Sequence, residues 1–180
     1  MLMRAERCAL LLIDVQARLL PHMHDAVQIL DSCVWLVRLA QKLGVPVLAS
    51  EQYPQGLGPT VPRLREALGP APVVPKVDFS CMREPALMQL TALSRPQTVV
   101  AGIEAHVCVL QTAMELCALG KQVFVVADAV SSRSPTSRDL GIERMRTAGV
   151  QIVSREMVAF EWLERAGTPQ FRDVSREFLR

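Results

Sequence analysis

The sequence predicts an α/β protein, a three-layer α/β/α sandwich in which a mostly parallel sheet of about six strands lies between two layers of helices. Short apolar runs recur along the chain, as in strands that are buried on both faces. Segments with apolar residues at every third or fourth position alternate with these runs, as in amphipathic helices. Because the connections are short, we expect right-handed βαβ units. The 180 residues are expected to form one domain, residues 1–180.

The short apolar runs are the predicted strands. The first, residues 8–13, is continuously apolar and is followed directly by Asp14. Residues 150–153 form a shorter candidate, and residues 72–75 give a weaker signal. The other predicted strands are residues 45–49, 98–101 and 123–127.

The predicted helices lie between these strands. Residues 27–43 place apolar side chains on one face, and Gly44 is expected to end that helix. Thr60 is a plausible cap in front of Pro62 for a helix that runs through Leu68. The remaining predicted helices are residues 84–93, 107–119, 136–148 and 171–179.

Composition and charge exclude several classes of protein. Half of the residues are hydrophobic and 21% are charged, so the chain can bury a sizeable core. The net charge is only +2 and aromatic residues make up 4%, so neither nucleic acid nor an anionic membrane is an expected partner. No apolar run approaches the roughly 18 residues that span a bilayer. The first residues lack the layout of a signal peptide, so a cytoplasmic location is expected.

The five cysteines are scattered and form no C-x-x-C pair, so neither a zinc site nor a disulfide framework is predicted. In a reducing compartment, most of them are expected to be small buried hydrophobes. Cys108 is the exception to consider, because it falls in the first turn of the helix predicted to begin near Val107. The N-terminus of a helix lowers the pKa of a thiol, and a nearby lysine lowers it further. Cys117 lies deeper in the same helix and lacks this advantage.

Polar residues collect where several predicted strands end. Asp14 ends the first strand, Lys76 follows the third, Cys108 follows the fourth, and Asp128 ends the fifth. The carboxyl ends of parallel strands meet at one edge of a sheet, and this edge is where ligands bind in open α/β folds. The sequence therefore predicts an edge that carries a carboxylate, an ammonium and a thiol.

Residues 11–16, residues 75–76 and residues 102–109 together resemble the isochorismatase-like cysteine hydrolases. That superfamily also contains nicotinamidases and N-carbamoylsarcosine amidases. Residues 50–60 resemble a subgroup, the isochorismatase domain-containing proteins, and residues 79–80 and 128–133 fit it too. The resemblance covers nearly the whole chain.

The resemblance implies a set of roles. Cys108 would be the nucleophile, Asp14 the general base, and Lys76 the residue that steadies charge and helps ionise the thiol. The family places a cis peptide bond before the nucleophile, here Ile103–Glu104, and the backbone N–H groups of Glu104 and Cys108 would form the oxyanion hole. The residues expected to bind substrate are Gln16, Gln52, Tyr53, Leu57 and His106. The implied activity is hydrolysis of a small amide, ureido or related carbonyl substrate through a thioester, at C–N bonds other than peptide bonds.

The chain departs from two branches of the superfamily. Nicotinamidases bind a divalent metal through histidines ahead of the lysine, but the histidines here are His22, His24 and His106. No metal or cofactor is therefore expected, and nicotinamide is a doubtful substrate. Isochorismatases proper cleave a vinyl ether and need not use the cysteine as a nucleophile, so that activity is the weaker interpretation.

Two other functions remain open at this point. One is a non-catalytic or regulatory protein that acts through protein partners. The other is a redox-sensing thiol at Cys108. Such a thiol would need a nearby resolving cysteine, whereas Cys117 is expected to be buried in the middle of the same helix. Selective alkylation of Cys108 with an apparent pKa well below about 8.5 is the behaviour expected of a hydrolytic or redox thiolate. Family members form dimers and larger symmetric assemblies, so a homo-oligomer is expected.

Overall fold

The computed structural model describes residues 1–179 and contains one six-stranded sheet in the order β3-β2-β1-β4-β5-β6. All neighbouring strands are parallel. The order reverses direction between β1 and β4, which creates the kind of switch point where α/β proteins bind ligands. The strands are β1 (Cys8–Ile13), β2 (Val47–Gln52), β3 (Val73–Lys76), β4 (Gln97–Ile103), β5 (Gln122–Ser131) and β6 (Gln151–Val153).

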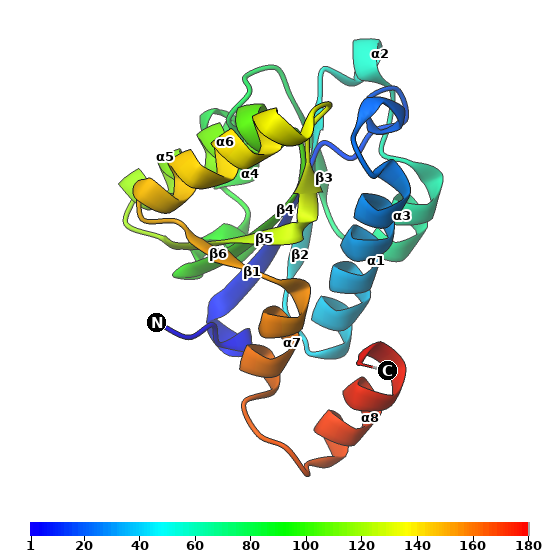
Figure 1. Cartoon of the computed structure of the whole chain (residues 1–180), viewed down its shortest axis with the longest axis vertical. Coiled ribbons are helices and arrows are strands. Elements are labelled where there is room, and N and C mark those ends of the chain that lie inside the picture. Colours follow the sequence, from blue (N-terminus) through cyan, green and yellow to red (C-terminus); the bar gives the residue numbers. More distant parts are fainter. Residues whose placement is uncertain (180) are drawn as a thin grey trace.

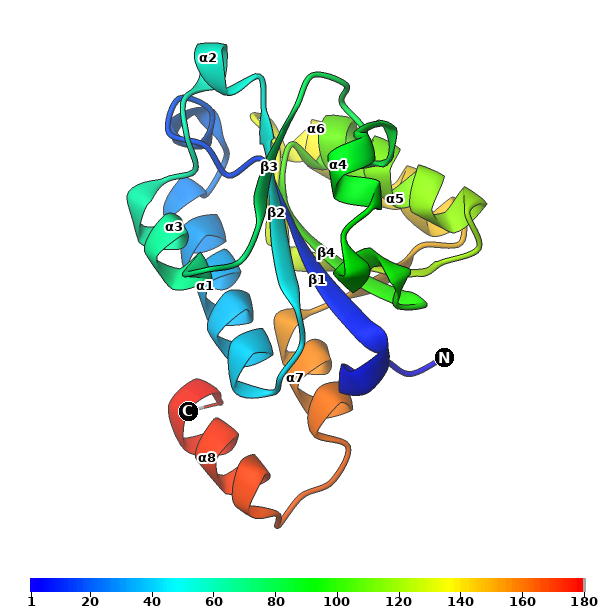
Figure 2. The same cartoon turned by 180° about the vertical axis from the view of Figure 1, so that it is seen from behind.

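Helices cover both faces of the sheet, so the predicted three-layer α/β/α fold is confirmed (Figures 1 and 2). One face carries α1 (Ala26–Lys42), α3 (Pro62–Leu68), α7 (Arg155–Leu163) and α8 (Pro169–Phe178). The other carries α4 (Pro85–Met88), α5 (Leu110–Ala118) and α6 (Pro135–Thr147). The short helix α2 (Pro54–Leu57) follows β2. No helix within residues 1–179 is long and apolar enough to cross a membrane.

The continuous apolar run of β1 follows from this arrangement. Leu10 and Leu12 pack into the core on the α1 face, whereas Leu11 and Ile13 pack into the core on the α5 face. All six residues of β1 are buried, and burial of each large aliphatic side chain contributes about 1.5–3 kcal/mol. The two layers of helices thus hold β1 in the middle of the molecule and fix the position of Asp14 at its end.

The structure differs from the sequence-based predictions at one helix, one helix cap and one helix that was not predicted. The predicted helix 84–93 is broken, because the Ser80 hydroxyl caps a 3₁₀ turn and the Glu84 carboxylate caps α4 separately. Thr60 does not cap α3, since its hydroxyl donates to Glu51 Oε1 at 2.7 Å. Helix α7 was not predicted, although its cap, Ser154, is a typical start signal and accepts from the Met157 N–H.

Asp128 does not end a strand, because β5 continues to Ser131 past a shift in its pairing with β4. Its carboxylate accepts from the Arg155 N–H at 2.9 Å, at the start of α7. On β4, Gly102 has φ of +120°, and a Cβ there would lie 2.1 Å from the Ile13 carbonyl oxygen. Only glycine permits this close approach of β1 and β4, beside the switch point.

Candidate active site

Asp14 directly follows β1 and is buried, with φ of +54°, a left-handed conformation that aspartate tolerates better than most residues. Ser50, near the end of β2, makes two hydrogen bonds with Asp14. The Asp14 N–H donates to the Ser50 carbonyl at 3.1 Å, and the Ser50 hydroxyl donates to Asp14 Oδ1 at 2.7 Å. The other carboxylate oxygen, Oδ2, accepts from Lys76 Nζ at 2.8 Å. Both oxygens of the carboxylate are therefore held by donors.

Lys76 ends β3 and reaches the same place. Its side chain and that of Asp14 are both 0% exposed, so the two charges form a fully buried ion pair. Lys76 Nζ also donates to Gln52 Oε1 at 2.5 Å and to the carbonyls of Phe79 and Asp78 at 3.1 and 3.3 Å. Burial lowers the pKa of Lys76, but the interactions with Asp14, Cys108 and Cys81 together outweigh that effect and the pKa is raised. The lysine is therefore a cation at neutral pH.

Cys108 lies in a π-helical turn, Ala105–Val109, that precedes α5. The helical segment therefore begins before Val107, and Cys108 is not in the first turn of an α-helix. The residue is 5% exposed, and its Sγ lies 4.0 Å from Gln52 Oε1.

The expectation of an acidic thiol at Cys108 is wrong. Burial raises its pKa, and the charge of the Asp14 carboxylate and a hydrogen-bond interaction with it raise it further, whereas Lys76 acts in the opposite direction. The resting site therefore holds a neutral thiol beside the Asp14 carboxylate, which is paired with Lys76. A thiol that keeps its proton in the resting state can give that proton to a general base during the reaction.

The turn that carries Cys108 is held from both sides. The peptide bond between Ile103 and Glu104 is cis, where the family resemblance places it. The Glu104 carbonyl accepts from the N–H groups of Val107 and Val109 at 3.1 and 3.2 Å. These contacts fix the backbone between β4 and the cysteine.

The segment that follows β5 also packs on this turn. His106 Nδ1 lies 2.8 Å from Ser132 Oγ, and the Glu104 carboxylate lies 3.3 Å from the Arg133 guanidinium. A Cβ at Gly141 of α6 would lie 2.9 Å from His106 Cα, so the helix backbone packs directly against the turn. His106 therefore has a polar partner on the side of the turn that faces residues 131–134.

The glutamines expected to bind substrate have protein partners. Gln16 is fully buried; its amide donates to the carbonyls of Gln52 and Gly58 at 3.0 and 2.7 Å and accepts from the Gln52 N–H at 2.7 Å. Its amide hydrogens thus hold the loop after β2. Gln52 binds Lys76 through its oxygen and the Val77 carbonyl through its nitrogen, at 2.6 Å. Of the residues expected to bind substrate, Gln52 is the one whose side chain lies beside the Cys108 sulfur.

Tyr53 and Leu57 make other contacts. Tyr53 is 53% exposed, and its ring covers Gly56, where a Cβ would lie 2.5 Å from two ring carbons. Leu57 is half-buried and packs against the core on the α1 face, across the sheet from the core that contains Cys108. The structure thus brings Asp14, Lys76 and Cys108 together, and it places these two side chains farther out on the loop.

Two members of the buried cluster had no predicted role. Ser50 binds Asp14, and the thiol of Cys81 donates to Ser50 Oγ at 3.4 Å. Burial, followed by the charge of Asp14, raises the pKa of Cys81 to about 11. Ser50 directly follows the predicted strand 45–49, so the rule that polar residues at strand ends form the site would have identified it. Cys81 carries no comparable signal.

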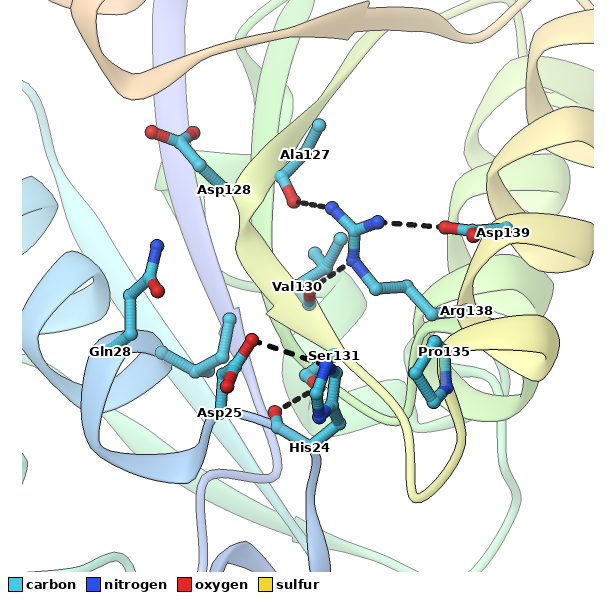
Figure 3. Close-up of a pocket in the computed structure, with 11 residues that line it drawn as sticks. His24, Asp25, Gln28, Ala127, Asp128, Val130, Ser131, Pro135, Arg138 and Asp139 are labelled. Atoms are coloured by element: carbon cyan, nitrogen blue, oxygen red, sulfur yellow. Dashed lines mark hydrogen bonds and ion pairs between the residues drawn. The ribbon is translucent and has the colours of Figure 1, made fainter.

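A separate cavity of about 260 Å³ lies between the start of α1, β5 and α6, and Figure 3 shows the residues that line it. Arg138 crosses it, donating to the carbonyls of Val130 and Ala127 at 3.1 and 2.5 Å and to Asp139 at 2.8 Å. The Ser131 hydroxyl donates to the His24 carbonyl at 2.6 Å. The lining residues do not include Asp14, Lys76 or Cys108. Within residues 1–179, no three His, Cys, Asp or Glu side chains gather so that they could hold a metal ion.

The fold and this cluster define a member of the isochorismatase-like hydrolases. Residues 8–157 match the family model described as the isochorismatase domain, so the chain belongs to the isochorismatase family. The predicted membership is therefore confirmed.

Among curated proteins, the chain is 37% identical over 169 residues to isochorismatase domain-containing protein 2 of Danio rerio, covering 93% of this chain and 84% of that protein. The human protein of the same name is 39% identical over 171 residues, which cover 93% and 80% of the two chains. These similarities also confirm the predicted subgroup.

Solved structures agree with this assignment. A structure described as MAR1 ribonuclease from Caenorhabditis elegans superposes with a TM-score of 0.93 at 34% identity, covering 100% of this chain and 93% of that one. YcaC from Escherichia coli, described as an octameric hydrolase of unknown specificity, superposes with a TM-score of 0.86 at 24% identity, covering 98% and 96%. The second similarity is one of fold.

Proposed function

We propose that this protein is a cysteine-dependent hydrolase of a small amide, ureido or related carbonyl compound, and that it works through a thioester. One observation carries the proposal: a fully buried Asp14–Lys76 ion pair lies in one cluster with the thiol of Cys108. An ion pair without solvent is expensive to maintain, so its position beside a nucleophile favours a chemical role. Membership of a hydrolase family points in the same direction.

The first half of the reaction forms the thioester. Asp14 accepts the proton of Cys108 as the sulfur attacks the substrate carbonyl, so the thiolate exists only during the attack. The backbone N–H groups of Glu104 and Cys108 receive the oxyanion, and such a donor contributes about 10²–10³ in rate. Lys76 stays cationic and steadies the negative charge that moves between the carboxylate and the sulfur.

The second half restores the enzyme. The tetrahedral intermediate collapses, the C–N bond breaks, and Asp14 returns the proton to the departing amine or ammonia. Asp14 then takes a proton from a water molecule that attacks the thioester. The C–S bond breaks, the acid leaves, and the proton on Asp14 returns to the Cys108 sulfur. Each proton that Asp14 accepts is given back within the cycle.

The alternatives use less of the cluster. Action only through protein partners would leave the buried ion pair and the neutral thiol without a chemical task. A redox-sensing thiol would favour an ionised sulfur, whereas burial and Asp14 raise the pKa of Cys108. Assembly into a homo-oligomer stays a prediction, and sedimentation at micromolar concentration tests it; a monomeric mass would contradict it.

The test is a panel of amides, ureido acids and esters, with RNA as a further substrate because one related structure carries the name of a ribonuclease. Cys108→Ala should be folded and inactive, and Cys117→Ala on α5 is the matched control that should keep full activity. With a slow ester, mass spectrometry should find an acyl group on the peptide that contains Cys108. Full activity of Cys108→Ala, or cleavage of RNA alone, would overturn the proposal.

A further inference from the structure

Two buried side chains beside the triad take no part in the reaction described above. Ser50 is 1% exposed and Cys81 is 0% exposed. The Cys81 thiol donates to Ser50 Oγ at 3.4 Å, and the Ser50 hydroxyl donates to Asp14 Oδ1 at 2.7 Å. The three groups form a chain of hydrogen bonds that runs from the segment after β3 to the general base.

The direction of this chain follows from its chemistry. A hydroxyl has one hydrogen and can also accept, whereas a carboxylate only accepts. Because Cys81 keeps its proton and donates to the Ser50 oxygen, the hydrogen of Ser50 is left to point at Asp14. The backbone is tied in the same way, since the Asp14 N–H donates to the Ser50 carbonyl at 3.1 Å.

The result is a carboxylate with a fixed plane. Ser50 holds Oδ1 and Lys76 Nζ holds Oδ2 at 2.8 Å, so rotation about the Cβ–Cγ bond of Asp14 would break two hydrogen bonds. A carboxylate has about four lone-pair positions, so further acceptor positions stay available to the Cys108 thiol. Lys76 alone would anchor one oxygen and leave the plane free to turn.

We propose that Ser50, with Cys81 behind it, is a positioning residue that orients the Asp14 carboxylate for proton exchange with Cys108. The inference rests on the proposed function, because it assigns Asp14 the role of base. Ser50 has no direct role toward the Cys108 sulfur or the substrate in this scheme, and it acts through Asp14.

Loss of the Ser50 hydroxyl should have two effects. The carboxylate loses a hydrogen bond that favours its charged form. The acid limb of the pH profile should therefore move to higher pH. The carboxylate also turns more freely, so kcat should fall about 10–100-fold while KM changes little, the size expected for a hydrogen bond to a charged group. A residue with only a structural role would lower stability without moving the pH profile.

The pH profile is informative because the other ionisable groups around Asp14 titrate at high pH. Lys76 faces it from β3, Cys81 from the turn before α4, and Cys108 from the turn after β4. The pKa of each of these groups is raised above its ordinary value. A change on the acid side of the profile therefore does not come from these three groups.

The experiment uses the whole protein and needs no identified substrate. The rate of iodoacetamide alkylation of Cys108 is followed by mass spectrometry from pH 4 to pH 10, and kcat and KM are measured on any substrate that the panel yields. In Ser50→Ala the acid limb should move to higher pH. Ser50→Thr, which keeps the hydroxyl, should restore the profile of the unmodified protein.

Two further variants complete the design. Cys81→Ala should move the same limb in the same direction by less, and it keeps the test decisive if Ser50→Ala does not fold. Thr98→Val is the matched control, because it removes a buried β4 hydroxyl that has no hydrogen-bond partner within residues 1–179, and it should leave the limb in place.

An unchanged acid limb in a folded Ser50→Ala or Cys81→Ala, with Cys108→Ala inactive, would overturn this inference and leave the hydrolase intact. Full activity of Cys108→Ala would instead overturn the proposed function and the inference together.

Discussion

Two ion pairs in this molecule have the same length and different surroundings. Lys76 Nζ and Asp14 Oδ2 are 2.8 Å apart at the end of the sheet, and both side chains are 0% exposed. Arg138 and Asp139, at the cavity of Figure 3, are also 2.8 Å apart, but their side chains are 29% and 66% exposed. Distance alone would rank the pairs as equal. Solvent makes the difference, because it screens the second pair and is excluded from the first.

The partners of the two pairs differ in the same way. At the buried pair, both oxygens of the Asp14 carboxylate accept hydrogen bonds from donors. The Lys76 ammonium lies within hydrogen-bond distance of four acceptor oxygens. At the cavity, Arg138 makes most of its hydrogen bonds to carbonyls of β5 and so stabilises that strand. Under the proposed function the buried pair serves chemistry, whereas the exposed pair serves local structure.

Removal of the buried cation should have the largest effect. Lys76→Met leaves the Asp14 carboxylate buried without its counter-charge, so the free energy of unfolding should fall by about 3–5 kcal/mol in urea titrations. The double variant Asp14→Asn/Lys76→Met removes both charges and should recover part of that loss. A loss below about 1 kcal/mol for Lys76→Met would show that water reaches the pair.

Loss of a buried neutral amide should come next. Gln16→Ala removes hydrogen bonds to the Gln52 N–H and to the carbonyls of Gln52 and Gly58, and it leaves those backbone groups unpaired. We expect a loss of about 2–3 kcal/mol by chemical denaturation. Gln28→Ala at the exposed cavity is the matched control and should stay within about 0.5 kcal/mol. Equal effects of the two variants would contradict the comparison.

Buried thiols should make the protein sensitive to alkali. Burial raises the pKa of Cys33 from 9.0 to about 12, so between these values the unfolded chain loses a proton that the folded chain keeps. Its contribution is fully present below pH 9 and is lost as the pH rises, by on the order of 1 kcal/mol at pH 10. Urea titrations at pH 7 and pH 10 should show this loss in the unmodified protein and a smaller one in Cys33→Ala. Identical losses in the two proteins would contradict the assignment.

The fold could be predicted from the sequence because the signals for strands and helices are local. The apolar run of β1 and the regular spacing in α1 need no distant contact to be recognised, and both elements lie where they were predicted. The positions of Asp14, Lys76 and Cys108 were accessible for the same reason, since each lies at or after the end of a strand. The acidity of Cys108 was not accessible, because it depends on the burial of the sulfur and on the charge of Asp14, which comes from another strand. The role of Gln16 was hidden in the same way, because its partners lie on a loop about forty residues away.

The exposed pair at the cavity should give the smallest effect. Asp139→Asn removes a carboxylate that is 66% exposed, while Arg138 keeps its bonds to the carbonyls of Val130 and Ala127. We expect a change of no more than about 0.5 kcal/mol in the free energy of unfolding, shrinking further in 1 M salt, and no change in activity. The same urea titration measures it beside Lys76→Met. A loss above about 1 kcal/mol would mean that the cavity holds its charges away from water, and the two sites would then differ less than their exposures indicate.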